Sequence, residues 1–357
     1  MVSTFGEVHA VDLYTSGPSS IAVSDAQHLH RLEQVAQWSD RHGCRGMLIY
    51  TDNKSVDPWV LAQHVIQHTT TLSPLIAVQP VYMHPYAVAQ KISALARLYG
   101  RAVDLNLVAG GFQCDLAALG DRLPHDRRYA RLAEYGALVT RLLGSDPVTF
   151  KGTYYSVFGL QLGPGISKDL MPRLTVSGSS PGGLKCAESL GATAITYPEP
   201  PSSDFTGRSD AIDPVPGSVD GTGIRIGILA RESADDAWAE AVRQFPPDAD
   251  RQARQEAVAK TSDSLWFQRL SALAQDHSAP KENVYWLGPF RNLQSFCPYL
   301  VGSYDSVAAQ LSAYLRDGVR VIILDCPHDE ADLVHAATAL RLARRPEVAR
   351  STTARRD

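Results

Sequence analysis

The sequence has little excess charge of either sign and no long apolar run. Its net charge is −4, so it lacks the basic surplus that neutralises phosphates, and nucleic acid is not an expected partner. No stretch approaches the about 18 apolar residues that a membrane span needs. The N-terminal residues also lack the basic and apolar regions of a secretory signal. We therefore expect a cytoplasmic protein that does not enter a membrane.

Cysteine is scarce, and several familiar motifs are missing. The five cysteines include no CxxC pair, which is typical of a reduced compartment. His64 and His68 have the i, i+4 spacing of a helical metal site. They lack the Glu of an HExxH motif, so we expect a solvated helix face and no metal. The absence of a GxGxxG turn after the first strand and of a GxSxG elbow argues against a dinucleotide-binding fold and a serine hydrolase.

Short β-branched runs alternate with longer amphipathic segments along the chain. Strands are predicted at 7–14, 46–51, 74–81, 102–109, 173–178, 192–197, 224–231 and 320–326. Helices are predicted at 28–42, 58–68, 85–98, 127–143, 182–190, 234–244, 304–316 and 329–343. Repeated strand-then-helix units build a parallel sheet. Eight of them favour a closed α/β fold, the (β/α)8 TIM barrel, over an open sheet.

The barrel is expected to occupy residues 1–345 as a single domain, followed by a flexible, Arg-rich tail at 346–357. Three insertions are predicted, at about 146–170, 198–222 and 245–300. The first contains VTFKGTYYSVFGLQL, which is typical of a β-hairpin. The second is rich in Pro, Ser, Asp and Gly and is interpreted as a loop. The third is interpreted as helical up to about residue 300.

In barrels of this kind the active site lies at the C-terminal ends of the strands. The run SGSSPGG at 177–183 joins a strand to a helix, where free N–H groups and the helix dipole favour an anion. The hydroxyls of Ser179 and Ser180 add donors, although a plain capped turn uses the same residue types. The cluster HDRRY at 125–129 could reach the same anion or form a solvated first turn. Asn106 lies in an apolar strand and needs polar partners there, from a heterocycle or from backbone.

Three motifs, in order along the chain, resemble the luciferase-like flavin monooxygenases. They are TLSPLIAVQPVYMHPYAVAQKISALARLYGRAVDLNLVAGG, HDRRYARLAEY and LTVSGSSPGG. The resemblance covers about residues 7–345, is densest from 72 to 197, and is closest to the alkanesulfonate monooxygenase branch, with long-chain alkane monooxygenases similar as well. It implies a two-component flavoprotein that takes FMNH₂ from an NAD(P)H-dependent flavin reductase. The reduced flavin then reacts with O₂ to a peroxyflavin that oxygenates a small organic substrate. Relatives form homodimers or homotetramers.

The resemblance also implies which residues contact the cofactor. Ser179, Ser180 and Tyr129 match positions that hold the FMN phosphate. Asn106 and His125 match positions near the ribityl chain or the ring. The flavin pocket and its ring end are matched by Gln79, Tyr82 and Thr51.

Several expected active-site positions depart from the alkanesulfonate pattern. A cysteine after the second strand is replaced by Ser55, an Arg-x-His pair on the seventh strand becomes Arg225-x-Gly227, and a tyrosine before Pro-His becomes Cys326. An arginine of the third insertion is matched by Arg291. The implied catalytic residues are therefore Arg225, Arg291, Ser55 and Cys326. We expect Gly227 to open space beside the flavin and the arginines either to bind an anionic group or to form structural ion pairs.

Because of these departures, a simple alkanesulfonate is not the expected substrate, and a tailoring oxygenase of natural-product biosynthesis is as plausible as a sulfur-scavenging enzyme. Two alternatives share the fold. One is an F420-dependent oxidoreductase, against which the sulfonate-branch motifs argue. The other is a non-catalytic flavin-binding relative, against which eight intact strands argue.

Overall fold

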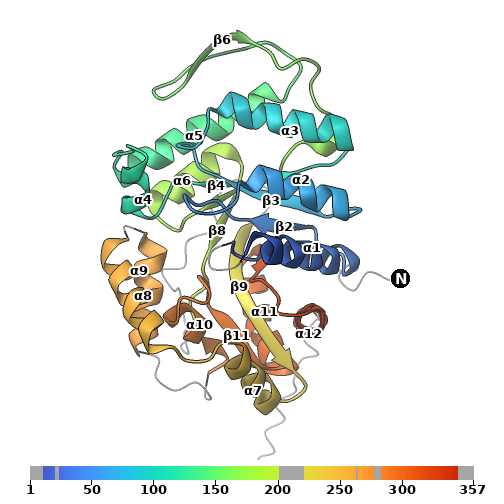
Figure 1. Ribbon diagram of the computed structural model, residues 1–357, viewed down its shortest axis with the longest axis vertical. Coiled ribbons are helices and arrows are strands. Elements are labelled where there is room, and N and C mark those ends of the chain that lie inside the picture. The colour runs from blue at the N-terminus through green and yellow to red at the C-terminus, as the bar shows by residue number, and fades with distance from the viewer. Residues whose placement is uncertain (1–10, 21–23, 201–220, 263, 277–282, 345–357) are drawn as a thin grey trace, which may run out of the picture.

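The fold is described from a computed structural model that covers residues 11–20, 24–200, 221–262, 264–276 and 283–344 (Figure 1). The start of the first predicted strand, most of the predicted insertion at 198–222 and the predicted tail at 346–357 lie outside the described residues.

Eight parallel strands close into a barrel, which confirms the predicted fold class. In order around the barrel they are β1 (Asp12–Ser16), β2 (Gly46–Ile49), β3 (Ser73–Val78), β4 (Asp104–Val108), β7 (Leu174–Ser177), β8 (Thr193–Thr196), β9 (Thr222–Arg231) and β12 (Val319–Leu324). The ring closes because β8 pairs with β9, β9 with β12 and β12 with β1. The short apolar runs read from the sequence are thus barrel strands buried on both faces.

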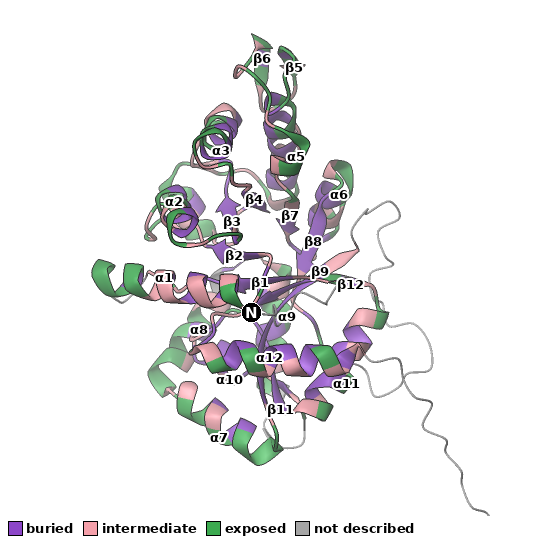
Figure 2. Cartoon of the chain, turned by 90° about the vertical axis from the view of Figure 1, so that its right-hand side faces the viewer, coloured by how far each residue is buried: buried purple, intermediate pink, exposed green. Residues whose placement is uncertain are grey.

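Eight helices surround the barrel, each close to its predicted position (Figure 2). They are α1 (Asp25–Arg41), α2 (Pro58–His68), α3 (Pro85–Tyr99), α5 (His125–Leu142), α6 (Pro181–Leu190), α7 (Ala234–Gln244), α11 (Tyr304–Arg316) and α12 (Glu330–Ala343). Local signals set their ends: Ser24 and Gln27 form a capping box, and Gly100 ends α3 at φ 62°. Within the described ranges, no helix has the length and apolar character to cross a membrane.

The interior of the barrel is filled by side chains rather than open. An inner cluster is contributed by strands around the ring and contains Tyr14, Leu48, Leu75, Ala77, Ile195, Val321 and Ile323. The N-terminal end is closed by a buried polar group, in which the Tyr14 hydroxyl donates to Asp104 at 2.8 Å and Arg45 donates to Tyr14 at 2.7 Å. Burial and the Asp104 charge raise the pKa of Tyr14, so its hydroxyl stays protonated. Because this buried polar group closes the N-terminal end of the barrel, a functional site is expected at the opposite, C-terminal end.

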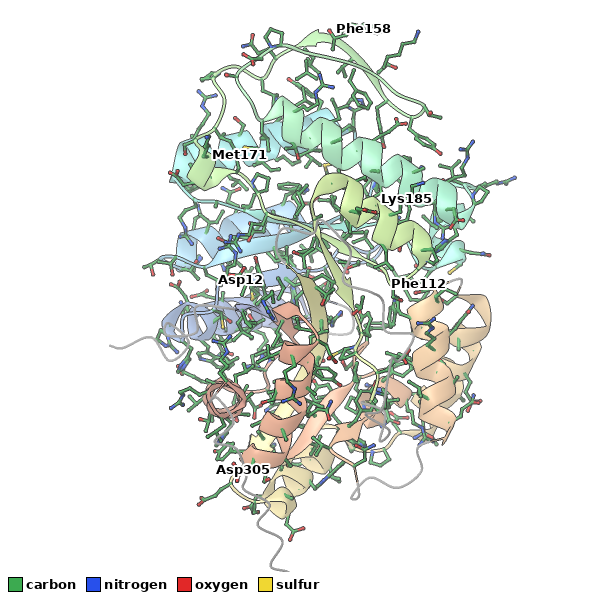
Figure 3. The ribbon with its side chains drawn as sticks, turned by 180° about the vertical axis from the view of Figure 1, so that it is seen from behind. Asp12, Phe112, Phe158, Met171, Lys185 and Asp305 are labelled. Atoms are coloured by element: carbon green, nitrogen blue, oxygen red, sulfur yellow. The ribbon has the colours of Figure 1, made fainter. Side chains whose placement is uncertain are left out.

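The first predicted insertion contains the expected hairpin, formed by β5 (Val148–Lys151) and β6 (Ser156–Leu160). It extends from the helical ring at one end of the molecule, where Figure 3 labels Phe158, whose exposed fraction is 75%. Two short elements were not predicted: the helix α4 (Gln113–Ala118) after β4 and a 3₁₀ turn at Lys168–Leu170.

The third insertion is not helical throughout, and the prediction was wrong for its last part. It contains α8 (Ala249–Thr261), α9 (Leu265–Asp276), β10 (Tyr285–Trp286), α10 (Gly288–Arg291) and β11 (Tyr299–Ser303). β11 runs parallel to the outer half of β9, where Tyr299 pairs with Gly227, and β10 adds an antiparallel strand. A five-residue apolar run is too short for periodicity to distinguish a strand from a buried helix turn, which is why the sequence did not reveal it.

Candidate functional site

A solvent-connected cavity lies at the C-terminal ends of β4 and β7. It is lined by Val108, Ala109, Gly110, Gly111, His125, Tyr129, Ser177, Gly178, Ser179, Ser180, Ser264, Leu265 and Trp266. The structure therefore brings together four of the residues predicted for the cofactor, which come from the starts of α5 and α6. Their contact with FMN stays a prediction.

The turn from β7 into α6 is shaped by a close approach between Gly178 and Tyr129. Gly178 has φ 147°, and a Cβ atom added to it would lie 2.1 Å from the Tyr129 hydroxyl oxygen. That hydroxyl donates to the carbonyl of Ser177 at 3.1 Å. Only glycine fits this backbone and this contact, so the turn is held against α5 with its N–H groups beside the cavity.

Ser180 is the N-cap of α6, and its buried hydroxyl accepts from the Gly183 N–H at 3.1 Å. Pro181 follows at the first helical position, where its missing N–H costs no hydrogen bond. The capped-turn interpretation is therefore present in the structure. It does not compete with anion binding, because the capping hydroxyl uses its oxygen as acceptor and keeps its proton to donate.

Within the HDRRY cluster the residues have different surroundings. Arg128 is buried and donates to the carbonyls of Leu123 and Gly110, so it fastens the start of α5 to the loop after β4. His125 lines the cavity, and its Nδ1 lies 2.9 Å from a carboxylate oxygen of Asp126. Arg127 is exposed.

Gln79 and Asn106 are buried amides on neighbouring strand ends. Asn106 pairs in register with Ala77 of β3 and Thr175 of β7, and Ala77 belongs to the inner cluster of the barrel. Its side-chain oxygen accepts from the hydroxyls of Thr175 at 3.0 Å and Ser177 at 2.9 Å. Gln79 lies beside Gly110, whose added Cβ would be 3.2 Å from its Nε2. The neighbouring side chains thus supply the partners that a buried Asn106 requires.

Two further predicted cofactor residues lie on the rim over β2 and β3. The hydroxyl of Tyr82 donates to Asn53 at 2.7 Å and ties the loops after these strands together. Burial and the charge of Asp52 raise the pKa of Tyr82 to about 12. Thr51 is half-buried at the end of β2. Neither residue lines the cavity beside Ser179.

Arg225 of β9 is the centre of a buried polar network inside the barrel end. Its Nη2 lies 3.0 Å from Asp325 and 2.5 Å from the hydroxyl of Tyr50, and its Nη1 lies 3.4 Å from the hydroxyl of Tyr197. Burial alone would lower the pKa of Arg225, but Tyr50, Tyr197 and Asp325 outweigh it and raise the pKa. Of the two roles predicted for Arg225, the structure contains the ion pair.

The other oxygen of Asp325 accepts from Ser295 at 2.6 Å and from the hydroxyl of Tyr299 at 2.8 Å. Both donors come from the third insertion, and sequence reasoning missed them because that segment was interpreted as helical. The network therefore joins the barrel to its insertion. Sequence analysis did not single out Asp325, since its partners are distant in the sequence.

Trp266 connects the network to the cavity. Its ring stacks on Tyr197 with centroids 4.0 Å apart and an angle of 21°, and it also lines the cavity beside Ser179. The sequence offered no signal for this role, because an aromatic residue in an amphipathic helix is usually a core residue.

The four residues that the resemblance made catalytic are not gathered in one cavity. Ser55 lines a small hollow near the ends of β1 and β2, with Tyr50 and His28. Cys326 lines another small hollow. Burial raises the pKa of Cys326 to about 12, so it is a thiol rather than a thiolate. Arg291 is the exposed last residue of α10.

Gly227 does not open the space that the sequence suggested. A Cβ atom added to it would lie 2.3 Å from the ring of Tyr299. The expectation of an enlarged pocket was therefore wrong, because a tyrosine from β11 fills the volume that the glycine leaves. Gly227 and Tyr299 form a complementary pair whose two members come from different segments of the chain.

Comparison with known proteins agrees with this architecture. Residues 7–320 match the family model of the luciferase-like monooxygenases. The chain is 33% identical to the 4-(gamma-L-glutamylamino)butanoyl-[BtrI acyl-carrier protein] monooxygenase BtrO of Niallia circulans, over 94% of this chain and 95% of that one. Among solved structures, it resembles the oxygenating constituent of 3,6-diketocamphane monooxygenase from Pseudomonas putida in complex with FMN (TM-score 0.64, 14% identity, 93% and 96% covered). It also resembles an F420-dependent secondary alcohol dehydrogenase (TM-score 0.62, 15% identity, 94% and 99% covered). The chain therefore belongs to the luciferase-like monooxygenase family.

Proposed function

We propose that this chain is the oxygenating component of a two-component system, which receives FMNH₂ from a separate NAD(P)H-dependent flavin reductase and oxygenates a small organic substrate with O₂. The proposal rests on the anion-binding geometry of the Gly178–Ser180 turn at the start of α6. There a helix N-terminus, two serine hydroxyls and His125 meet beside one cavity. This arrangement suits a phosphate.

The residues present fit FMN at both of its polar ends. Ser179 and Ser180 would hold the phosphate, because Gly178 lets the backbone approach closely and the hydroxyls can donate. Asn106 and Gln79 would offer amide groups to the polar edges of the ring system, since Asn106 contacts Ser177 and Gln79 lies beside Gly110, and both of these neighbours line the cavity. When bound, reduced FMN supplies the two electrons with which one atom of O₂ becomes water while the other enters the substrate.

The remaining side chains would shape the site around a bound cofactor. Trp266, stacked on Tyr197, lines the cavity on the insertion side and would limit the access of water once the cofactor is bound. The ion pair between Arg225 and Asp325 holds the hydroxyls of Tyr50 and Tyr197 toward the interior of the barrel end. We expect these fixed hydroxyls to orient the substrate through hydrogen bonds.

For the substrate we propose an acyl group that is carried on an acyl-carrier protein, as in the name of the relative from Niallia circulans, and we place the reaction in natural-product biosynthesis. The charge of Arg225 is already neutralised by Asp325, so a buried sulfonate would add an uncompensated negative charge.

The cofactor is tested by anaerobic titration with photoreduced FMN and, separately, with reduced F420. We expect FMNH₂ to bind and the S179A/S180A double variant to bind it about 2–4 kcal/mol more weakly, at about 1–2 kcal/mol for each lost charge-assisted hydrogen bond. Ser303→Ala is the matched control, because it removes the N-cap of α11 outside the cavity. Equal weakening in the control would assign the effect to folding, and selective binding of F420 would replace this proposal with the oxidoreductase alternative.

The substrate class is tested with FMNH₂ supplied by a reductase. We expect little sulfite from octanesulfonate and a mass gain of one oxygen atom on a carrier-bound acyl chain. Sulfite release at about 1 s⁻¹ or faster would return the chain to the sulfur-scavenging class.

A further inference from the structure

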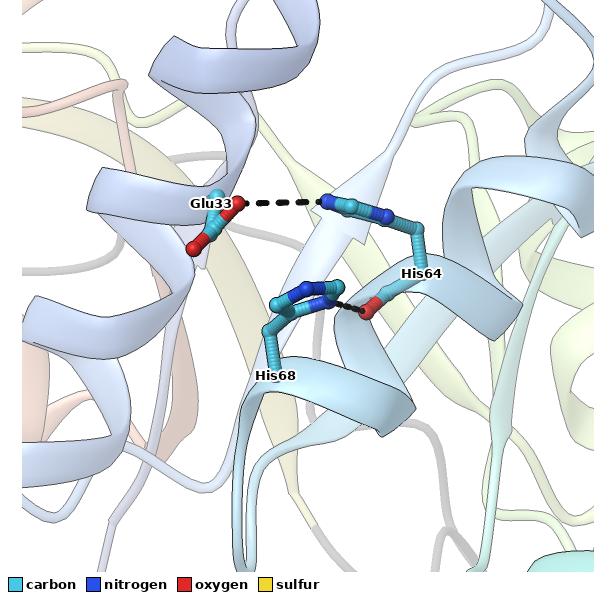
Figure 4. A group of neighbouring side chains, drawn as sticks. All are labelled: Glu33, His64 and His68. Atoms are coloured by element: carbon cyan, nitrogen blue, oxygen red, sulfur yellow. Dashed lines mark hydrogen bonds and ion pairs between the residues drawn. The ribbon is translucent and has the colours of Figure 1, made fainter.

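Two adjacent outer helices bring one carboxylate and two imidazoles together on the outside of the barrel (Figure 4). Glu33 lies on α1, and His64 and His68 lie one turn apart on α2. One ligand atom from each of the three residues lies within 4.8 Å of the other two. We propose that these residues form a zinc site that braces α1 against α2, separate from the cavity at the strand ends.

The spacing between His64 and Glu33 suits a shared metal better than a direct hydrogen bond. His64 Nε2 lies 3.6 Å from Glu33 Oε2, beyond ordinary hydrogen-bond length. Two ligands at the usual zinc distances in a tetrahedral site are roughly 3.3 Å apart. His64 Nε2 is also buried and has no hydrogen-bond partner within the described residues. A buried nitrogen of this kind needs a partner, and a metal ion would supply one.

The outer contacts of the other two ligands are those that accompany metal binding. His68 Nδ1 lies 2.8 Å from the carbonyl oxygen of His64. Because a carbonyl only accepts, Nδ1 carries the proton and Nε2 keeps its lone pair for a ligand bond. The second oxygen of Glu33 accepts from Gln37 at 3.2 Å, which holds the carboxylate in place. Such bonds behind the ligating atoms fix tautomer and orientation in known metal sites.

The charge balance of the cluster also favours a cation. The rings of His64 and His68 lie with centroids 4.0 Å apart, so protonating both places two positive charges side by side. Two imidazoles and one carboxylate are a ligand set typical of Zn²⁺, with a fourth position for water at the exposed side of His68.

Sequence reasoning dismissed this pair because no glutamate follows His64 in an HExxH motif. The carboxylate instead comes from the preceding helix, through the packing of α1 on α2. The separation of Glu33 from the histidines along the chain carried no signal, since the register between the two helices is a property of the folded barrel.

The test uses the full chain without a histidine tag, stripped with a chelator and titrated with Zn²⁺ by calorimetry. We expect one equivalent to bind and the unfolding temperature to rise with zinc. His68→Ala and Glu33→Gln should each weaken binding by about 100-fold or more, since even outer-shell losses cost 10–100-fold. His30→Ala is the matched control, because His30 is an exposed histidine of α1 outside the cluster.

Co²⁺ provides a second readout that does not depend on stability. The wild-type chain and the His30→Ala variant should give the intense visible absorption of a tetrahedral site, and the two ligand variants should not. Circular dichroism confirms that the variants fold, as the surface positions of Glu33 and His68 lead us to expect. No zinc binding at micromolar concentration, or equal affinity in the wild-type chain and both ligand variants, would overturn the proposal.

Discussion

Replacing Gly227 by alanine tests whether the glycine and Tyr299 are complementary. The added Cβ would lie 2.3 Å from two atoms of the Tyr299 ring and 2.4 Å from a third. Real carbon atoms in contact lie about 3.5–4.0 Å apart, so the ring or the strand must shift by more than an ångström. The ring has little freedom to do so, because it is 4% exposed and its hydroxyl is bonded to Asp325.

The expected loss of unfolding free energy for Gly227→Ala is about 1–3 kcal/mol, the usual cost of overpacking a core. Tyr299→Ala alone should cost about 3–5 kcal/mol, since it empties the volume of a buried aromatic ring. In the G227A/Y299A double variant the new methyl group meets no ring. The two losses should therefore be less than additive by about 1–3 kcal/mol.

Urea denaturation of the four proteins measures this coupling. Gly111→Ala is the matched control, because its added Cβ would meet only Ser264, at an ordinary 3.6 Å. It should cost less than about 0.5 kcal/mol. If Gly227→Ala cost no more than the control, or cost the same with and without the Tyr299 ring, the argument for a filled pocket would be refuted.

Three further outcomes are expected. Asp325→Ala leaves Arg225 charged and buried without its partner, so denaturation should show a loss of about 3–5 kcal/mol, and a loss below about 1 kcal/mol would contradict a buried ion pair. Ser180→Ala should lower the free energy of unfolding by about 1 kcal/mol, because it removes the N-cap of α6, whereas Ser179→Ala should leave it nearly unchanged. Equal losses in the two variants would show that Ser180 has no special capping role. Burial raises the pKa of Asp40, but hydrogen bonds from Thr70 and Thr71 outweigh it and lower the pKa to about 2. The folded pKa is thus below the unfolded one, so this contribution is present above about pH 4 and lost toward pH 2, and Asp40→Asn should flatten the acid limb of a pH series of unfolding free energies.

The elements that sequence analysis found are those whose signals are local. The helix α2 begins at Pro58, as predicted, and α6 ends at Leu190, as predicted, just before Gly191 in the left-handed region. Alternation of such strands and helices was enough to give the barrel. The serines and His125 were also predicted to lie at the active end of the barrel, and they line one cavity there, whereas their contact with a cofactor stays a prediction.

The residues that sequence analysis missed depend on contacts between distant segments. Tyr299 pairs with Asp325 and fills the space at Gly227, but its strand is five residues long and gave no distinct period. Trp266 reaches the cavity only because α9 folds back over the barrel end. A substitution read from one strand, such as the glycine at 227, cannot be interpreted without the residue that faces it.

The strand β9 is shared between two sets of neighbours: its first half belongs to the barrel and its second half pairs with β11. Side chains alternate along a strand, so a slip by one residue would turn Arg225 away from the barrel interior and direct Ile226 there instead. Such a slip would break the pairing with β12 and with β11 at the same time. The register of β9, and with it the inward orientation of Arg225, is therefore fixed by two pairings: with β12 in the barrel and with β11 in the insertion.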